Sequence, residues 1–297
     1  MKRAVILGCG FVGTRVARLL AGSGWEVTGV TRTAESAARL ASEPFRAIAC
    51  DIADAGALAA AGELHGADAV VSAVSSGHRG EETYREVYLN GLRNAIECLN
   101  PGRILFVSST SVYAQNDGSW VAEQSPAQPK TPTGLILRGA EDMALNHGGT
   151  VARLAGIFGP GRSVLLRRFL ENRAIIEGDG GRHINQVHAD DAAGALAHIV
   201  MHELPPGIYN VADDKPMTQM ECYSWLAAHL SRPLPPIVDS GPAEANRKRG
   251  LTDKRVSNAK LRSLGWPLIY PSFPEAVQRD VSLLEAARAG GSGDGPP

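Results

Sequence analysis

Short runs of consecutive apolar residues alternate along this chain with longer stretches in which apolar residues recur at helical spacing. The runs predict buried strands, and the stretches predict helices with one buried face. Strands are expected at 4–7, 25–30, 47–50, 69–73, 103–107, 150–154 and 208–211, and helices at about 14–20, 34–40, 55–61, 81–99, 134–146, 163–172, 190–202 and 218–230. Strands that are apolar throughout and alternate with helices are typical of a parallel sheet covered on both faces.

The regular alternation of predicted strands and helices changes after about residue 155, which predicts that the chain has two structural parts. Residues 1–155 are expected to form an α/β domain with a Rossmann-type doubly wound parallel sheet. Residues 156–285 are expected to form a smaller C-terminal substrate-binding lobe, with 184–211 returning to the sheet. A Pro-rich loop is predicted at 232–250, a final helix begins near Pro274, and the Gly- and Pro-rich tail 286–297 is predicted to be disordered.

A glycine-rich turn joins the first predicted strand to the first predicted helix. Gly8 allows a tight turn, Gly10 allows the backbone to approach a diphosphate, and Gly13 allows the helix to pack closely on the strand. The start of the helix offers N–H groups and a partial positive charge to phosphates. An ordinary glycine-rich turn is the alternative, but the strand before it and the helix after it favour a dinucleotide site.

Charge and cysteine content exclude several classes of protein. The 297 residues include 30 Lys and Arg against 31 Asp and Glu, which does not favour binding to nucleic acid or to an anionic membrane. Four widely spaced cysteines indicate a reducing compartment. The first predicted strand begins too early for a signal peptide, and no apolar stretch approaches the roughly 20 residues that span a bilayer. We therefore expect a cytoplasmic protein.

Metal and nucleophile motifs do not change this interpretation. His198 and His202 are four residues apart on a predicted helix, but the sequence offers no evident third ligand. Neither a nucleophile elbow nor a Walker-type loop is present. We therefore expect no metal site.

Several further motifs stand in one order along the chain. They are Asp51-Ile52, Ser108-Ser109-Thr110-Ser111-Val112-Tyr113, Gly156-Ile157-Phe158-Gly159-Pro160-Gly161, Val187-His188-Ala189-Asp190-Asp191, Tyr209-Asn210-Val211 and Leu264-Gly265-Trp266-Pro267. With the glycine turn, they make residues 1–285 resemble the extended short-chain dehydrogenase/reductases, the NAD-dependent epimerase/dehydratase family. The resemblance implies a nicotinamide cofactor and a small-molecule substrate.

The catalytic pattern of that family is incomplete here. The resemblance places Ser109 at the Ser/Thr position, and Glu141 sets the register of the helix that should carry Tyr-x-x-x-Lys. In that register Thr133 replaces the Tyr and Leu137 replaces the Lys, so the chain resembles an atypical subgroup. Losing a general acid or base typically costs about 10²–10⁴ in rate. Tyr113 is a candidate substitute acid, although such a Tyr more often packs beneath the substrate loop.

Substrate contacts are expected from the second lobe. The resemblance places His183, Asn185 and His188 along the substrate side, although a structural role for His188 is at least as plausible as catalysis. Arg162 could hold an anionic group of the substrate, or it could be an ordinary solvated arginine.

Cofactor choice depends on the end of the second predicted strand. An NAD site usually has an acidic residue there for the ribose 2′-hydroxyl, but this chain has Arg32, which can pair with a 2′-phosphate. A solvated Arg32 is the alternative. We therefore expect NADP in preference to NAD. The predicted cofactor-binding residues are Gly8, Gly10, Phe11, Val12, Gly13, Arg32, Asp51, Ile52, Ala73 and Ser108.

Two functions of different kinds remain open. One is an NAD(P)-dependent oxidoreductase or epimerase/dehydratase-like enzyme that acts on a small polar substrate with a non-standard acid/base. The other is a catalytically inactive, NADP-binding sensor or scaffold, which the replacements at Thr133 and Leu137 favour. The resemblance also implies a homodimer through the helices at 81–99 and 134–146, because these pair between subunits in many relatives.

Overall fold

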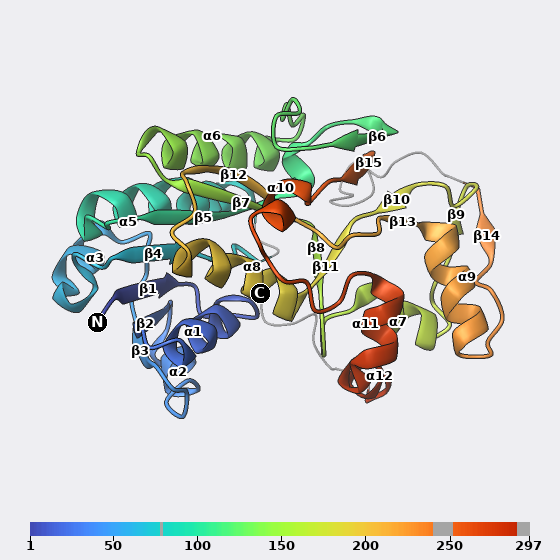
Figure 1. Ribbon diagram of the computed structural model, residues 1–297, viewed down its shortest axis with the longest axis horizontal. Coiled ribbons are helices and arrows are strands. Elements are labelled where there is room, and N and C mark those ends of the chain that lie inside the picture. The colour runs from blue at the N-terminus through green and yellow to red at the C-terminus, as the bar shows by residue number, and fades with distance from the viewer. Residues whose placement is uncertain (78–79, 240–251, 290–297) are drawn as a thin grey trace.

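The computed structural model describes residues 1–77, 80–239 and 252–289. Its centre is a seven-stranded parallel sheet with the strand order β12-β7-β5-β4-β1-β2-β3 (Figure 1). These strands are β1 (Arg3–Leu7), β2 (Glu26–Thr31), β3 (Arg46–Ala49), β4 (Ala69–Ser72), β5 (Ile104–Ser109), β7 (Thr150–Leu154) and β12 (Gly207–Val211). The order reverses between β1 and β4, and ligands of open α/β sheets bind at such a switch point. The predicted Rossmann-type fold is confirmed.

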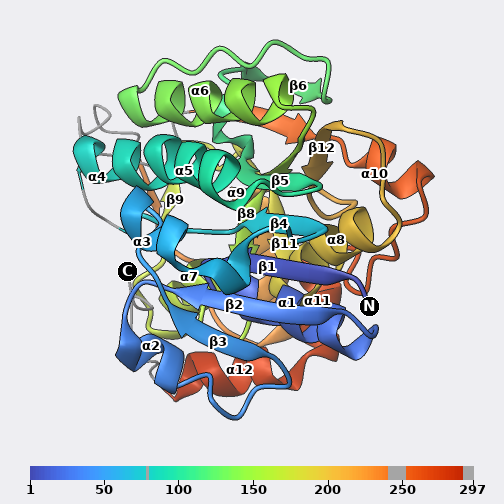
Figure 2. The same cartoon turned by 90° about the vertical axis from the view of Figure 1, so that its left-hand side faces the viewer.

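Helices cover both faces of the sheet (Figures 1 and 2). One face carries α1 (Gly13–Gly22) and α8 (Ala189–Met201), which pack on each other. The other face carries α3 (Ala55–Ala60), α5 (Gly91–Leu99) and α6 (Pro132–Asn146), while the short α2 (Ala34–Ala38) precedes β3. The single helix expected at 81–99 is instead α4 (Glu81–Arg85), a π-helical turn (Glu86–Asn90) and α5.

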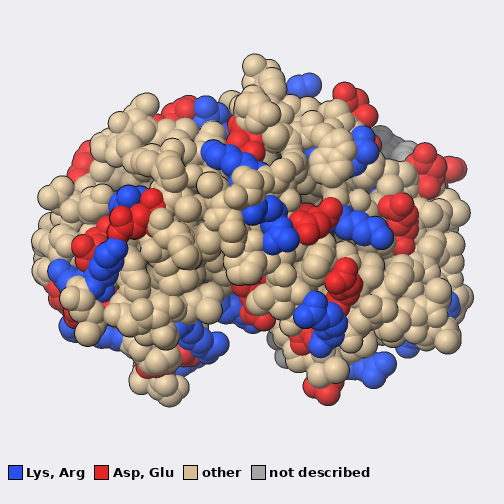
Figure 3. Space-filling view, viewed as in Figure 1, with Lys and Arg blue, Asp and Glu red and all other residues tan. Residues whose placement is uncertain are grey.

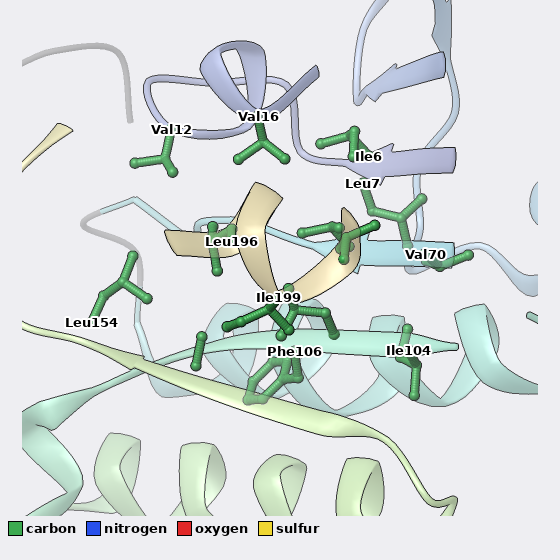
Figure 4. Close-up of a cluster of buried hydrophobic side chains, with 14 of the residues drawn as sticks. Ile6, Leu7, Val12, Val16, Val70, Ile104, Phe106, Leu154, Leu196 and Ile199 are labelled. Carbon is green, nitrogen blue, oxygen red and sulfur yellow. The ribbon is translucent and has the colours of Figure 1, made fainter. Parts of the chain in front are cut away.

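The main hydrophobic core lies between the sheet and these helices (Figure 4). Ile6, Val70 and Phe106 come from three strands and are fully buried. Leu196 and Ile199 of α8 pack into the same core. These residues belong to the apolar runs of the sequence, so hydrophobic burial explains why the strands form where the pattern predicts them.

A second hydrophobic core defines the C-terminal lobe. It lies among α7 (Val164–Leu170), α9 (Gln219–His229), α11 (Phe273–Arg279) and α12 (Val281–Arg288). The lobe and its junction also contain the short strands β8 (Gly156–Phe158), β9 (Ile176–Glu177), β10 (His183–Ile184), β11 (Gln186–His188), β13 (Met217–Thr218) and β14 (Ile237–Val238). The short helix α10 (Ala259–Ser263) instead packs on β12 and contributes Leu261 to the main core. Within 184–211, β12 joins the sheet and α8 covers it, whereas β11 pairs with β8.

Two sequence predictions need correction or restriction, and one pair of strands was not predicted. The disordered tail expected from residue 286 is wrong for 286–288, because these residues complete α12 and Ala287 packs against the second core. The strand β6 (Asn116–Val121), which the sequence pattern did not indicate, pairs with the distant β15 (Asp253–Val256). Part of the predicted 232–250 loop, from 240 onward, and the tail from 290 lie outside the described residues.

No helix among the described residues is long and apolar enough to cross a membrane. Lys and Arg are interspersed with Asp and Glu on the face in Figure 3, so this face carries no extended field of one sign. The surface is indented at the lower edge of this view, between the side formed by the N-terminal strands and the side formed by α11 and α12.

Candidate cofactor and substrate site

Two glycines of the turn after β1 are required by close backbone contacts. Gly8 has φ +90°, and a Cβ at this position would lie 2.7 Å from the Cα of Val74, which follows β4. A Cβ on Gly13 would lie 2.1 Å from the carbonyl oxygen of Gly8. Only glycine avoids both overlaps, so the turn brings α1 directly against the carboxyl ends of β1 and β4.

Gly10 is different, because a Cβ built there meets no atom within 4 Å. The absence of a side chain at this exposed position therefore leaves open space in front of the turn. Helix α1 begins behind that space with no side-chain cap and no acidic residue in its first turn. Uncapped N–H groups at a helix start favour an anion, so the backbone here fits a diphosphate.

Phe11 links this turn to the second lobe. The Arg15 guanidinium lies 4.4 Å from the centre of the Phe11 ring, and that of Arg162 lies 5.4 Å from it. Arg15 also donates to the Phe11 carbonyl oxygen at 2.6 Å and to the Asp190 carboxylate at 2.9 Å. Arg162 is therefore beside the glycine turn, and Arg15 connects that turn to the start of α8.

The predicted adenosine-side residues follow β2 and β3. Arg32 follows β2 directly and is exposed, and Thr33 then caps α2. Asp51 is exposed and accepts a hydrogen bond from the backbone N–H of Ala53 at 3.0 Å, whereas Ile52 is buried. Both β2 and β3 end at the same edge of the sheet as the glycine turn, because the strands are parallel.

Ala73 and Ser108 lie at the carboxyl ends of β4 and β5. The backbone N–H of Ala73 donates to the Leu7 carbonyl oxygen at 2.8 Å, so this residue is held beside β1. The Ser108 hydroxyl is buried and donates to the Glu141 carboxylate at 2.7 Å. The Ser108 side chain is therefore engaged with α6, which does not favour its predicted contact with a cofactor.

A buried ion pair fixes α6 against the sheet. Arg153 of β7 donates from Nε and Nη2 to the two carboxylate oxygens of Glu141, at 2.9 and 2.6 Å. Both side chains are at most 1% exposed. Arg153 was not among the predicted site residues, and the signal for it in the sequence is a charged residue inside an otherwise apolar strand.

The structure leaves the predicted acid/base positions without a suitable group. Leu137 is 2% exposed and belongs to the main core, and Thr133 lies in the first turn of α6. Tyr113 is fully buried, and its hydroxyl is shared between the Ala122 carbonyl and the Asn210 side chain, at 3.0 and 2.9 Å. Burial raises the pKa of Tyr113. This placement does not favour the predicted catalytic role of Tyr113.

Ser109 is more accessible than Tyr113. It ends β5 and is partly exposed, and its hydroxyl accepts the backbone N–H of Ser111 at 3.1 Å. The hydroxyl proton stays available for a substrate oxygen. Ser109 therefore keeps the geometry expected of a hydrogen-bonding residue at the carboxyl edge of the sheet.

His183 and Asn185 connect the second lobe to β15. Asp253 accepts hydrogen bonds from the backbone N–H of His183 at 2.9 Å and from its Nδ1 at 2.8 Å. Asn185 donates to the Lys254 carbonyl oxygen at 2.9 Å and accepts the Val256 N–H at 2.7 Å. The Asn185 side chain is thus used structurally, while His183 retains partial exposure.

His188 is buried at the junction of the two lobes. Its Nδ1 accepts the Asp190 N–H at 3.3 Å and caps α8, and its ring packs edge-on against Phe158 and Tyr270. Its Nε2 lies 3.2 Å from the Asp280 carboxylate, although the angle does not make a hydrogen bond. Burial lowers the pKa of His188. The structure therefore gives His188 a structural role and no access to a substrate.

Metal ligands do not gather in the part of the chain that the structure describes, where no group of three or more His, Cys, Asp or Glu side chains could hold an ion. His198 instead makes a hydrogen bond with the Leu264 carbonyl oxygen at 3.0 Å.

Comparison with known proteins agrees with this architecture. Residues 4–212 match the NAD dependent epimerase/dehydratase family. Protein YeeZ of Escherichia coli is 30% identical over 91% of this chain and 97% of its own length. A solved structure from Methylobacillus flagellatus, named for the same family, is 29% identical with a TM-score of 0.76, covering 97% of this chain and 99% of that one.

A dTDP-glucose 4,6-dehydratase from Streptomyces venezuelae, solved with NAD bound, shares the fold at 24% identity and a TM-score of 0.78, covering 97% of this chain and 98% of that one. The family match spans most of the chain, from the glycine turn through β12. The chain therefore belongs to the NAD-dependent epimerase/dehydratase family.

Proposed function

We propose that this protein is an NAD(P)-dependent oxidoreductase or epimerase/dehydratase-like enzyme that acts on a small polar substrate with a non-standard acid/base. The observation that carries the proposal is the uncapped start of α1 behind the open space at Gly10, at the point where the strand order reverses. Bound there, a nicotinamide cofactor supplies hydride chemistry. Ser109 would orient a substrate oxygen at the same edge of the sheet.

NADP is the cofactor that we propose. Arg32 is exposed directly after β2, where an NAD site usually has a carboxylate for the ribose 2′-hydroxyl. A guanidinium can form two parallel hydrogen bonds with a phosphate. One of the relatives named above was solved with NAD, so the proposal of NADP rests on this chain's own Arg32 and not on the comparison.

Titration calorimetry with NADP and NAD tests the cofactor and its choice together. We expect NADP to bind more tightly than NAD, and Arg32→Glu to weaken NADP binding by roughly 10- to 100-fold, because a carboxylate would repel the 2′-phosphate. NAD binding should change much less. Arg39→Glu is the matched control, because Arg39 is also exposed and its side chain donates to the Ser36 hydroxyl within α2.

Equal NADP affinity in the wild type and in Arg32→Glu would contradict the cofactor choice. Failure of both nucleotides to bind would contradict the whole proposal.

An inactive NADP-binding sensor or scaffold is the second candidate. The observation that favours it is the burial of Leu137 and Tyr113, which leaves no standard proton donor beside Ser109. Oxidation of NADPH by any member of a panel of small aldehydes and ketones would favour the enzyme, because a sensor requires no turnover.

We further propose a cytoplasmic homodimer formed through α4 and α6. The groove between these helices encloses about 360 Å³ and is lined by Leu89, Leu135 and Ile136, with Glu81, Arg85 and Lys130 beside them. Leu135 is 59% exposed in the single chain. An apolar surface with charges of both signs beside it suits a twofold contact between identical chains.

A further inference from the structure

A proton donor is the part of the proposed active site that α6 does not supply. Reduction of a carbonyl group adds a hydride to carbon and a proton to oxygen, so an enzyme needs an acid near the substrate oxygen. The chain has six tyrosines, and all six lie in the described residues. Their positions can therefore be compared directly.

Four of these tyrosines are poorly placed. Tyr113 is fully buried with its hydroxyl engaged. Tyr209 donates to the Pro205 carbonyl at 2.7 Å, before the start of β12 and hence near the amino edge of the sheet. Tyr223 and Tyr270 pack in or against the core of the C-terminal lobe. Only Tyr84 and Tyr88 remain beside the sheet.

Tyr84 and Tyr88 form a contact pair on the segment that precedes α5. Their ring centres are 4.4 Å apart, and the Tyr88 ring meets the Phe106 ring of β5 edge-on at 6.4 Å. Ser108 follows Phe106 by two residues, so its side chain lies on the same face of the strand. The tyrosine pair therefore packs on the sheet face that α6 also covers.

The direction of this segment places Tyr84 toward the carboxyl edge of the sheet. α4 and α5 connect the parallel strands β4 and β5, so they run opposite to β5 (Figures 1 and 2). Tyr84 lies four residues before Tyr88, which corresponds to about 6 Å along the helix axis. Two residues forward along β5 cover about 6.6 Å. Tyr84 is thus approximately level with Ser108, and helical side chains lean further toward the helix start.

The part of α6 that lacks the family's catalytic Tyr and Lys lies close to this level of the sheet. Glu141 is hydrogen-bonded to Ser108, and Leu137 lies one turn nearer the start of α6. α4 and the π-helical turn both pack against α6. The helix that carries Tyr84 therefore packs directly on the helix whose Leu137 supplies no polar group.

The π-helical turn is a second, independent observation. It includes Tyr88 and begins two residues after Tyr84. Such turns are rare and occur frequently at functional sites, because the extra residue changes the direction of the side chains before it relative to those after it. Here it lies between Tyr84 and α5, and Tyr84 packs against the edge of the main core beside Tyr88.

We infer that Tyr84 is the catalytic proton donor of this enzyme, presented from α4 in place of the missing tyrosine of α6. The inference rests on the proposed function. As hydride reaches the carbonyl carbon, the Tyr84 O–H bond breaks and the O–H bond of the product alcohol forms. The resulting phenolate then takes a proton from water.

The surroundings of Tyr84 keep its phenol protonated before reaction. Burial raises the pKa of Tyr84, and the adjacent Tyr88 phenol raises it further. Such a phenol stays protonated at neutral pH but is a weak acid while the site is empty. A positively charged oxidised nicotinamide nearby would lower this pKa.

NMR of the full chain carrying ¹³C at tyrosine Cζ tests the placement without a substrate. Tyr84→Phe identifies the Tyr84 resonance by its loss. With saturating NADP⁺, established by calorimetry, we expect the Tyr84 resonance at neutral pH to shift, because the positive ring charge polarises a nearby phenol. NADPH, whose nicotinamide ring is uncharged, should shift it less.

An unchanged Tyr84 resonance in protein saturated with NADP⁺ would overturn the inference while leaving the proposed function standing. If calorimetry shows no binding, the proposed function fails and the inference fails with it. Tyr209→Phe is the matched control, because it removes a hydroxyl near the opposite edge of the sheet and should leave the response of Tyr84 intact.

Rate measurements give a second readout. With NADPH and small aldehydes and ketones, Tyr84→Phe should lose about 10²–10⁴-fold in turnover at unchanged NADPH affinity. Turnover equal to that of Tyr209→Phe would overturn the inference.

Discussion

The three glycines in the turn after β1 have different structural roles, and the glycine motif alone does not distinguish these roles. Gly8 and Gly13 avoid overlaps with neighbouring backbone, whereas Gly10 only keeps space open. Cys9, between them, is 8% exposed, and burial raises the pKa of its thiol to about 12. The thiol therefore stays protonated and fills space in the turn, as its position in the sequence indicates.

The different tasks of these glycines give a prediction. Gly10→Val should weaken NADP binding at least about tenfold while changing the free energy of unfolding by less than about 1 kcal/mol, because the new side chain fills open space. Gly13→Ala should instead lower the free energy of unfolding by about 1–3 kcal/mol, because its Cβ overlaps the Gly8 carbonyl. Calorimetry and urea unfolding measure the two effects.

Gly62→Val is the control, because a Cβ at Gly62 also meets no atom within 4 Å and the residue lies away from the turn. Gly10→Val with wild-type NADP affinity would show that no ligand occupies the space in front of the turn.

Elements far apart in the sequence are joined by buried polar groups. Glu141 and Arg153 join α6 to β7, and Asp191 joins α8 to the segment before α11. The Asp191 carboxylate accepts the backbone N–H groups of Ile269 and Tyr270, at 2.5 and 3.0 Å. Such groups are costly to bury without partners, so they specify which elements meet.

Asp191 also predicts a pH dependence of stability. Burial raises its pKa to about 6, although the two N–H donors oppose this shift. An unfolded aspartate has a pKa of about 3.9, so between roughly pH 4 and 6 the folded chain holds a proton that the unfolded chain releases. The contribution of Asp191 to stability is therefore fully present below about pH 4 and is lost as the pH rises to about 6.

Urea unfolding at several pH values measures this contribution. Between pH 4.5 and 5.5, the free energy of unfolding of the wild type should fall, relative to that of Asp191→Asn, by up to about 1.4 kcal/mol per pH unit. Parallel curves for the two proteins would mean that Asp191 titrates normally. Asp214→Asn, at a half-exposed neighbouring acid, is the control.

At the scale of the whole molecule, the proposed dimer surface lies on the side of the sheet covered by α4 and α6, away from the second hydrophobic core (Figure 2). Leu135→Glu should convert the proposed dimer into a monomer of 31.3 kDa, because a charge would be buried in the apolar contact. Light scattering after size exclusion measures the mass. Leu19→Glu is the control, because Leu19 is exposed on α1. A wild-type monomer at micromolar concentration would contradict the proposal.

The local pattern of apolar residues was sufficient to predict most strands of the central sheet. The apolar runs at 4–7, 69–73 and 150–154 became strands because each run can be buried on both faces only inside a sheet. The three glycines were recognisable because their spacing reflects the local path of a strand–turn–helix unit. The resemblance to the family also identified the position of Glu141, and this position showed that Thr133 and Leu137 replace the expected Tyr and Lys.

Only the tertiary structure decided the partners of residues that lie far apart. It buried Tyr113 and turned Ser108 toward Glu141, and it packed Tyr84 on Tyr88 and Tyr88 on Phe106. It also paired β6 with β15 across more than a hundred residues. The physical reason is that periodicity reports how a segment is buried, whereas hydrogen-bond partners depend on which segments meet. The sequence by itself therefore determined the sheet and the glycine turn, and the packing of distant elements decided which polar groups remain free for chemistry.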